Sequence, residues 1–482
     1  MSCAGGPGDD GGTGRRRHEF ARSEWGDRLP FECGPSRLIA ITLSGGFPLD
    51  RRTFLQQATA ITALAAAPEL ALAGPKSRYD LPRRVGGPGD RARERHGGPL
   101  TLDPWKYGKS SAATDTVLMF RGNPSHTFYG TGPIPEKPRV LWRHRMIDFS
   151  TKYYGRPHTW RGTGWTGQAA KLGDYVFIGS QGGHLYAFEA ASGKLRWRYK
   201  GRRMFKASVC IYNNHIYVGN VDNHLRCLDA ATGDVKWKLR WSRDLDSSAC
   251  VADGKLYIAG ETGYARCINP ADGHLHWKTF VGGINRGPKG GSYGSETSPA
   301  VADGEYYCAT YDGILFCLDA KTGKVRWKAR TGDDTDASPV VLGDRVYTAA
   351  ENKSPYVFAF ARKDGKELWR FRSRGGFWAT PAVTQDTVYI GSHGGQMLAL
   401  ANDTGKPRWT YRIGTPTWSS ACVVGDKVVF GAYDGRLRCL DTKTGKEVWT
   451  LKLGGRIHST PCIVDGKIYI GTRKGYFYAI GA

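Results

Sequence analysis

Short apolar runs alternate with polar residues and turn residues through most of this chain, from about residue 140 to the last residue. Alternation over roughly four to eight residues is typical of β-strands that bury one face. One unit has expected strands at 420–424, 428–432, 436–441 and 447–453. Asp434-Gly435 lies between two of them, and this pair favours a tight hairpin turn because glycine adopts positive φ. The pattern predicts a unit of four antiparallel strands.

This unit recurs with a tryptophan in its last strand, and successive tryptophans are separated by 40, 40, 50, 42, 40 and 40 residues. They are Trp197, Trp237, Trp277, Trp327, Trp369, Trp409 and Trp449. A glycine stands four residues before each of them: Gly193, Gly233, Gly273, Gly323, Gly365, Gly405 and Gly445. A period of about 40 residues with four short strands is typical of the blades of a β-propeller.

Counting the copies predicts the number of blades. Seven complete copies start near Trp165, Ser208, Ser248, Ser298, Ser338, Thr380 and Ser420. An eighth starts near Thr460 and lacks its last strand, which residues 140–145 resemble. The prediction is an all-β fold, an eight-bladed β-propeller of four-stranded antiparallel blades, with the last blade closed by an N-terminal strand at about 140–146. Such closure leaves no open sheet edge in the ring.

The sequence motif that repeats from blade to blade resembles that of a known family. Leu185-Tyr186-Ala187-Phe188-Glu189 with Trp197, and Leu315 to Asp319 with Trp327, resemble the PQQ-like (quinoprotein-type) propeller repeat over residues 117–482. The resemblance implies that the tryptophans dock each blade onto its neighbour. It is weakly specific for function, because the family includes PQQ-dependent dehydrogenases, the outer-membrane assembly lipoprotein BamB and modules without known chemistry.

Three regions are expected along the chain. Residues 50–56 read Asp-Arg-Arg-Thr-Phe-Leu-Gln and resemble a twin-arginine (Tat) export signal, followed by an apolar run at 58–67 and a small-residue site at 71–73. Residues 1–73 are therefore interpreted as this signal preceded by an over-extended start, with initiation near Leu49. Residues 74–116 are basic and rich in glycine and proline, which predicts a disordered linker. The propeller is expected at 117–482, in a protein exported to the periplasm or beyond.

The formal net charge of +25 is carried by the propeller and linker, because residues 1–73 hold equal numbers of basic and acidic side chains. Such a charge favours an anionic glycan or lipid surface as a neighbour, or serves solubility alone. Nucleic acid is not expected as a partner of an exported protein. No later stretch reaches the ~18 continuous apolar residues of a transmembrane helix. We expect a monomer without a transmembrane segment.

Nine of the eleven cysteines follow residue 73. Cys227, Cys267, Cys317 and Cys439 stand where other copies carry alanine, which predicts small buried side chains. Cys308 and Cys317 are expected to face each other across an Asp312-Gly313 turn. Two free thiols are the preferred interpretation, because facing cross-strand cysteines are rarely bonded.

One register does not repeat from blade to blade, and it is the candidate site. It is the residue two before each inner-strand start, at the mouth of the central channel: Trp165, Lys206, Asp246, Glu296, Asp336, Trp378, Trp418 and His458. Variation at one register of a regular scaffold is typical of ligand specificity. Ordinary loop side chains around a water-filled hole are the alternative.

The ring divides into two arcs. Asp246, Glu296 and Asp336 form an acidic arc that predicts a site for a hard cation such as Ca²⁺. The aromatic arc suits a sugar or a planar ring. Two longer loops, Met146 to Gly164 and Val281 to Ser295, are expected to border the same mouth.

Two functions fit these features. The preferred one is a non-catalytic binding or scaffolding module of the cell envelope that holds a protein, a glycan or a small ligand at the channel mouth. The alternative is a PQQ- and Ca²⁺-dependent dehydrogenase of alcohols or sugars. The resemblance then implies Asp336 as base, Lys206 or an arginine on the quinone oxygens and a tryptophan as stacking floor. The near-minimal blades and the absence of adjacent cysteines favour the binding module, for which no catalytic residue is assigned.

Overall fold

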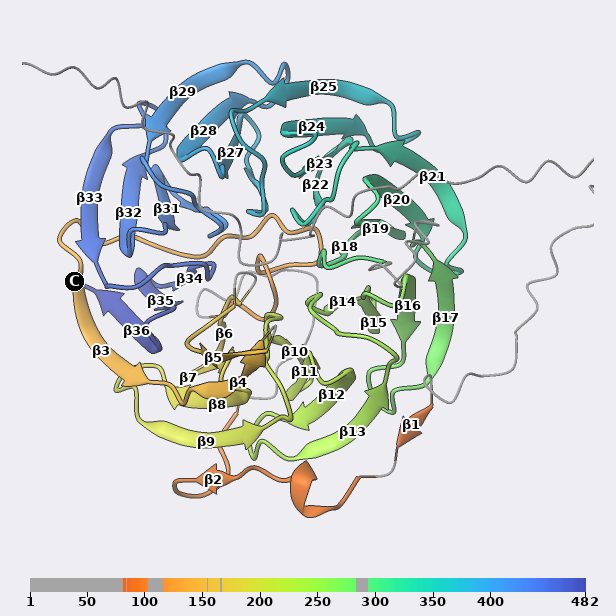
Figure 1. Ribbon diagram of the computed structural model, residues 1–482, viewed down its shortest axis with the longest axis vertical. Coiled ribbons are helices and arrows are strands. Elements are labelled where there is room, and N and C mark those ends of the chain that lie inside the picture. The colour runs from red at the N-terminus through yellow and green to blue at the C-terminus, as the bar shows by residue number, and fades with distance from the viewer. Residues whose placement is uncertain (1–80, 84, 103–115, 154, 165–166, 283–293) are drawn as a thin grey trace, which may run out of the picture. The chain divides into compact units, whose positions relative to one another are not determined.

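The computed structural model describes residues 81–83, 85–102, 116–153, 155–164, 167–282 and 294–482. Eight antiparallel sheets are arranged around a central axis, and each contributes four blade strands, named A to D from the axis outward (Figure 1). Within these residues there is one short 3-10 helix, η1 (Pro88–Asp90), and no helix has the length and apolar character needed to cross a membrane. The predicted eight-bladed, all-β propeller is confirmed.

Each strand position has its own character. The A strands are β6 (Ala170–Leu172), β10 (Cys210–Tyr212), β14 (Cys250–Ala252), β18 (Ala300–Ala302), β22 (Val340–Leu342), β26 (Ala382–Val383), β30 (Cys422–Val424) and β34 (Cys462–Val464). The B strands are β7 (Tyr175–Gly179), β11 (His215–Asn220), β15 (Lys255–Ile258), β19 (Glu305–Ala309), β23 (Arg345–Ala349), β27 (Thr387–Gly391), β31 (Lys427–Gly431) and β35 (Lys467–Gly471). The C strands are β8 (His184–Glu189), β12 (His224–Asp229), β16 (Tyr264–Ile268), β20 (Ile314–Asp319), β24 (Tyr356–Ala361), β28 (Gln396–Ala401), β32 (Arg436–Asp441) and β36 (Tyr476–Gly481). The D strands are β9 (Leu195–Lys200), β13 (Val235–Arg240), β17 (Leu275–Phe280), β21 (Val325–Arg330), β25 (Glu367–Arg372), β29 (Pro407–Arg412), β33 (Glu447–Lys452) and β3 (Arg139–Arg145).

The ring is closed by strands from opposite ends of the described chain. β3 pairs antiparallel with β36, with Trp142 opposite Ala479, in the sheet ordered β3-β36-β35-β34. This is the closing strand that the sequence predicts. Pairing the first blade strand with the last removes a free edge from the ring, which stabilises the circular arrangement against opening.

The hairpins between strands B and C differ from the prediction in register. In blade 4, Tyr307 is opposite Cys317 and Cys308 is opposite Phe316, so the expected facing of Cys308 and Cys317 is wrong. The turn is longer than two residues: the Gly313 N–H donates to Thr310 O and the Thr310 N–H to Ile314 O. One added residue shifts every pair by one position. Both thiols are free, as are all nine cysteines of the described residues, and all nine are buried.

The tryptophans join neighbouring blades. The Trp197 indole N–H donates to Ala230 O at 3.0 Å, and its ring lies where a Cβ on Gly233 would stand, 2.7 Å from a ring carbon. The same pairing recurs with Trp142 on Gly193, Trp237 on Gly273, Trp277 on Gly323, Trp327 on Gly365, Trp369 on Gly405 and Trp409 on Gly445. The role in blade docking that the family resemblance implies is confirmed for these tryptophans.

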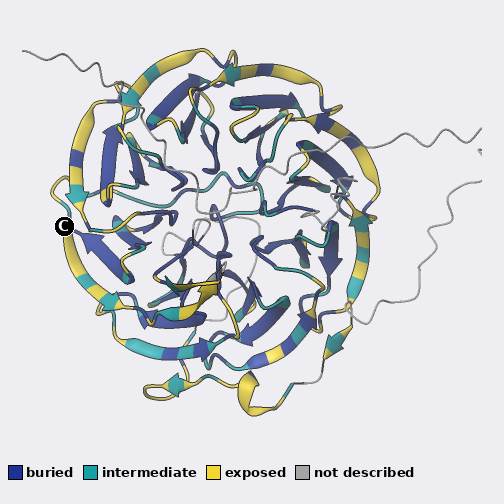
Figure 2. Ribbon diagram, in the orientation of Figure 1, coloured by how far each residue is buried: buried dark blue, intermediate teal, exposed yellow. Residues whose placement is uncertain are grey.

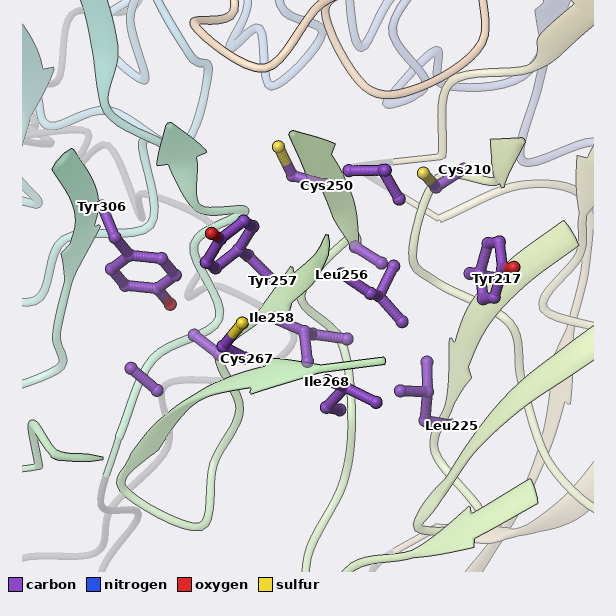
Figure 3. Packing of buried hydrophobic residues seen from close by; sticks show 14 of the residues in the cluster. Cys210, Tyr217, Leu225, Cys250, Leu256, Tyr257, Ile258, Cys267, Ile268 and Tyr306 are labelled. Atoms are coloured by element: carbon purple, nitrogen blue, oxygen red, sulfur yellow. The ribbon is translucent and has the colours of Figure 1, made fainter. Parts of the chain in front are cut away.

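The hydrophobic core lies between the blades. Figure 3 shows Cys210, Tyr217, Cys250, Tyr257, Cys267 and Tyr306, from three successive blades, within one cluster. The inner strands are buried and the outer D strands carry the exposed positions (Figure 2). The cysteines at the A and C positions fill small spaces, as the alanine-cysteine exchange predicts.

Residues 117–134 cross the ring and contact the inner strands of several blades. Along this segment, Val117 pairs with Lys171, Leu118 O accepts from Ile211 N, Pro124 O from Val301 N and Ser125 O from Val341 N. The Arg121 guanidinium is fully buried and donates to Pro381 O at 2.9 Å and to Ala421 O at 2.5 Å. Because these partners belong to inner strands around the ring, the segment crosses the centre, as the orange trace in Figure 1 shows.

A second N-terminal segment runs along the outside of blades 1 and 2. β1 (Pro82–Arg83) pairs with β13, and β2 (Glu94–Arg95) pairs with β9. Leu100 is buried against the same two blades. For the described part of 74–116, the prediction of a disordered linker is therefore wrong, because its backbone satisfies the open edges of two D strands. Residues 103–115 lie outside the described part.

Trp409 and Trp449 differ in the docking contact, because Trp409 packs on Gly445 and no described glycine lies against Trp449. The Trp409 indole N–H donates to Thr442 O at 2.8 Å, whereas that of Trp449 has no hydrogen-bond partner among the described residues. We expect Trp409→Phe to lower the free energy of unfolding by about 1 kcal/mol more than Trp449→Phe, because only the first loses a hydrogen bond. Urea denaturation of both variants measures this, and equal losses would show that the hydrogen bond contributes nothing.

Candidate functional site at the channel mouth

The candidate ring positions lie on loops that enter each blade from the preceding one. In several blades the side chain before the ring residue packs on a glycine at the end of strand B of the previous blade, as Phe205 does on Gly179 and Ile457 on Gly431. Thr163 makes the same contact with Gly471, so Gly164 takes the ring position of blade 1. Trp165, which the sequence suggests for this place, lies outside the described residues. The other seven candidates start consecutive blades.

A second ring of eight positions completes the mouth, and the sequence analysis missed it. Its members lie one to three residues after strand B, in the turn into strand C: Gln181, Val221, Glu261, Tyr311, Glu351, His393, Tyr433 and Arg473. In most blades the N–H of this residue donates to the carbonyl two residues before the first-ring position, as Glu351 N does to Asp334 O. Their residue type also changes from blade to blade, and this is the signal that identifies them in the sequence.

The acidic side of the mouth is built around a buried ion pair. The Lys206 ammonium donates to the Asp246 carboxylate, with side chains 4% and 2% exposed. Glu261 and Glu296 stand beside this pair, and one carboxylate oxygen from each of Asp246, Glu261 and Glu296 lies within 4.8 Å of the others. Among the described residues, this is the one group of three or more potential metal-ligating side chains that meets this distance.

The surroundings shift the proton affinities of these groups strongly. Burial and then the Asp246 charge raise the pKa of Glu261 to about 9 and that of Glu296 to about 7. Burial alone would lower the pKa of the Lys206 ammonium, but Asp246 and Glu296 outweigh it and raise this pKa. The mouth therefore holds more negative charge than its lysine neutralises, and it takes up protons when no other cation is present.

Asp336 belongs to a neighbouring acidic group. The predicted metal trio of Asp246, Glu296 and Asp336 is not brought together within 4.8 Å, and Glu261 takes the third place. Burial and the charge of Asp334 raise the pKa of Asp336, and burial and the charge of Glu351 raise that of Asp334 to about 9. The group that meets this distance therefore contains Glu261, from the turn after strand B, where the sequence suggests Asp336.

The aromatic side of the mouth is a set of rings in mutual contact. The Trp378 and Trp418 ring centroids are 3.7 Å apart at an interplanar angle of 48°. Tyr433 stacks on His458 at 4.7 Å and 21°, and Trp418 lies 4.5 Å from His458. Both ring nitrogens of His458 are buried without a hydrogen-bond partner among the described residues. Burial lowers the pKa of His458 well below its usual range, so this imidazole is uncharged at neutral pH, while the Arg456 guanidinium lies 4.9 Å from the Tyr433 ring centre.

The first of the two long loops borders this mouth. It forms a hairpin of β4 (Phe149–Tyr153) and β5 (Arg156–Trp160), and Trp160 is buried against Met204 and Val221 of blade 2. Arg473 of blade 8 lies 6.0 Å from the Trp160 ring centre. The hairpin therefore lies over the start of the ring, as expected. Most of the second loop, residues 283–293, lies outside the described part.

The chain has the fold of a PQQ-type repeat propeller: its blades are short and regular, and the residues at its channel mouth differ from blade to blade. The family model described as outer membrane protein assembly factor BamB (PQQ_2) matches residues 135–297, 261–426 and 417–482. The chain belongs to this family. No curated protein sequence gives a match.

Solved structures with low identity share the fold. BamB from Moraxella catarrhalis is 16% identical with a TM-score of 0.56, over 71% of this chain and 100% of that one. A europium-containing methanol dehydrogenase is 16% identical with a TM-score of 0.61, over 77% and 99%. The quinohemoprotein alcohol dehydrogenase from Comamonas testosteroni is 15% identical with a TM-score of 0.62, over 77% and 82%. The fold is thus shared by an assembly factor and by enzymes.

Glu351 allows a test of the protonated state of the acidic mouth. Burial and the charge of Asp333 raise the pKa of its carboxyl to about 7. A raised pKa means that stability is highest below the unfolded value and falls as pH rises through about 7. We expect Glu351→Gln to gain about 2 kcal/mol in free energy of unfolding, relative to the unmodified protein, between about pH 5 and pH 8.

Urea denaturation across this pH range makes the measurement. Glu136 is exposed, and Glu136→Gln is the control that leaves the pH dependence unchanged. A pH dependence that Glu351→Gln does not flatten would show that this carboxyl ionises normally in the folded protein.

Proposed function

We propose that this protein is a non-catalytic binding module of the cell envelope that engages a partner protein at its channel mouth. The observation that carries the proposal is the chemistry of the mouth. On one side of the mouth carboxylates outnumber basic groups. On the other side the aromatic rings pack against one another. A closed mouth of this kind suits recognition of cationic groups at its surface.

The described residues do not fit PQQ, the cofactor implied by the quinoprotein branch. PQQ is a flat tricarboxylate, so it requires cationic partners and an open aromatic face. The Lys206 ammonium is already paired with Asp246, and Asp244, Glu261, Asp334 and Asp336 add further acidic groups. The Trp378 and Trp418 rings contact each other at 3.7 Å and leave no slot between them. A dehydrogenase mechanism through PQQ, with Asp336 as base, is therefore not supported.

A protein partner is favoured by the family. The matching family model and one similar structure carry the name BamB, and the family description is that of an outer-membrane assembly factor. The twin-arginine signature at 50–56 supports export of this chain to the same compartment. The positive charge of the whole chain, +25, attracts anionic surfaces, whereas the mouth attracts cations. The mouth is thus suited to a basic protein segment, while the net charge of the whole chain favours an anionic lipid or glycan layer as a neighbour.

Site-specific photo-crosslinking in cells tests the partner. Lys353, at the mouth, has an 89% exposed side chain, and Asp344, on the opposite face, has a 90% exposed side chain. We expect a photoreactive amino acid at position 353 to crosslink a discrete envelope protein and the same residue at 344 to crosslink none. Equal crosslinking from both faces, or from neither, would contradict a partner at the mouth.

Quinone loading tests the alternative. The purified protein with PQQ and Ca²⁺ is expected to show no quinone absorbance after desalting and no dye-linked oxidation of alcohols or sugars. Retained quinone with substrate-dependent dye reduction would overturn the non-catalytic proposal.

A further inference from the structure

We propose that Asp246, Glu261 and Glu296 form a binding site for a hard cation, of which Ca²⁺ is the biologically available example, held by the protein without a quinone. The site lies between blades 3 and 4. Asp246 starts blade 3, Glu261 follows strand B of the same blade, and Glu296 starts blade 4. The inference goes beyond the proposed function, since it holds whichever partner the mouth engages.

The spacing of the oxygens fits a single ion. Ca²⁺ binds carboxylate oxygens at about 2.3–2.6 Å, so two oxygens on one ion are at most about 5 Å apart. One oxygen from each of the three side chains lies within 4.8 Å of the others. Neighbouring carbonyls and water supply the remaining ligands that Ca²⁺ requires in such sites.

A buried oxygen without a partner points to a missing ligand. Asp246 is 2% exposed, and its Oδ2 accepts from the Lys206 ammonium. Its Oδ1 is buried and has no hydrogen-bond partner among the described residues. Leaving a buried carboxylate oxygen unpaired costs free energy, and a cation at the cluster removes that cost.

Charge also favours a cation at the cluster once its glutamates are ionised. Asp246 is the one member of the three that forms an ion pair within the described residues, and its partner is Lys206. Glu261 and Glu296 add two carboxylates, and Asp244 lies close enough to act on Glu261. When both glutamates are ionised, the three carboxylates carry more negative charge than the Lys206 ammonium neutralises, and a metal ion competes with protons for them. A divalent ion balances the two glutamates, while an all-oxygen donor set selects hard ions over thiophilic ones.

The backbone holds the three side chains at fixed places. The Ser295 N–H donates to Gly260 O at 3.3 Å and joins the residues before Glu296 and Glu261. The Leu245 side chain, before Asp246, packs against Gly219 and Gly260. Each carboxylate residue follows a residue that contacts the end of a strand. The blades therefore hold the three side chains in place, which favours metal binding with little rearrangement.

The test is calorimetric titration of the chelator-treated full-length protein with Ca²⁺, with Tb³⁺ luminescence as a second readout. We expect one ion per chain. Glu261→Gln and Glu296→Gln are each expected to weaken binding at least tenfold, while Glu136→Gln, at an exposed position, leaves it unchanged. Circular dichroism establishes that the variants are folded. Lys206→Met is expected to strengthen binding, because it removes the competing ammonium from Asp246.

Absence of Ca²⁺ and Tb³⁺ binding by the unmodified protein would overturn this inference, as would binding that Glu261→Gln and Glu296→Gln leave intact. Neither result bears on crosslinking from position 353, so the partner proposal is judged separately.

Discussion

The contact between a tryptophan of one blade and a glycine of the next is the constraint on which the rest of the structure depends. Each docking ring leaves no room for a Cβ at its glycine, and its indole nitrogen reaches a backbone carbonyl beside that glycine in most blades. Repetition of one contact fixes the angle between blades, and eight such blades close with β3 beside β36. Because most blades repeat the same packing residues, the residues at the mouth can vary without disturbing the ring.

At the mouth, the acidic side chains and the aromatic side chains lie on different blades. In a chain with a formal charge of +25, the acidic groups gather on blades 3 to 5, and the aromatic rings on blades 6 to 8. Residues 117–134 cross the ring, and the buried Arg121 donates to the carbonyls of Pro381 and Ala421 beside the inner strands. This arrangement is the basis for our proposal that the mouth engages cations and not an anionic quinone.

Periodicity in the sequence predicts the fold well because it reports a contact that every blade repeats. The spacing of Trp197 to Trp449 and the isolated strand at 140–145 are enough to predict eight blades and their closure. The register between Cys308 and Cys317 was mispredicted because a turn one residue longer carries the same Asp-Gly pair. The outer strands β1 and β2 were missed because their pairing uses backbone atoms, and the side chains of a glycine- and proline-rich segment do not indicate it.

The candidate site was predicted in part. Lys206, Asp246 and Glu296 share one register, which the sequence displays at regular spacing. Glu261 comes from a second register whose closeness to the first depends on how the turn after strand B folds over the mouth. A crystal structure of the full-length protein grown with Tb³⁺ and PQQ together tests the account most directly. It predicts an anomalous peak among Asp246, Glu261 and Glu296 and no quinone at Trp378 and Trp418. A quinone stacked on either tryptophan, or no metal peak at the three carboxylates, would contradict it.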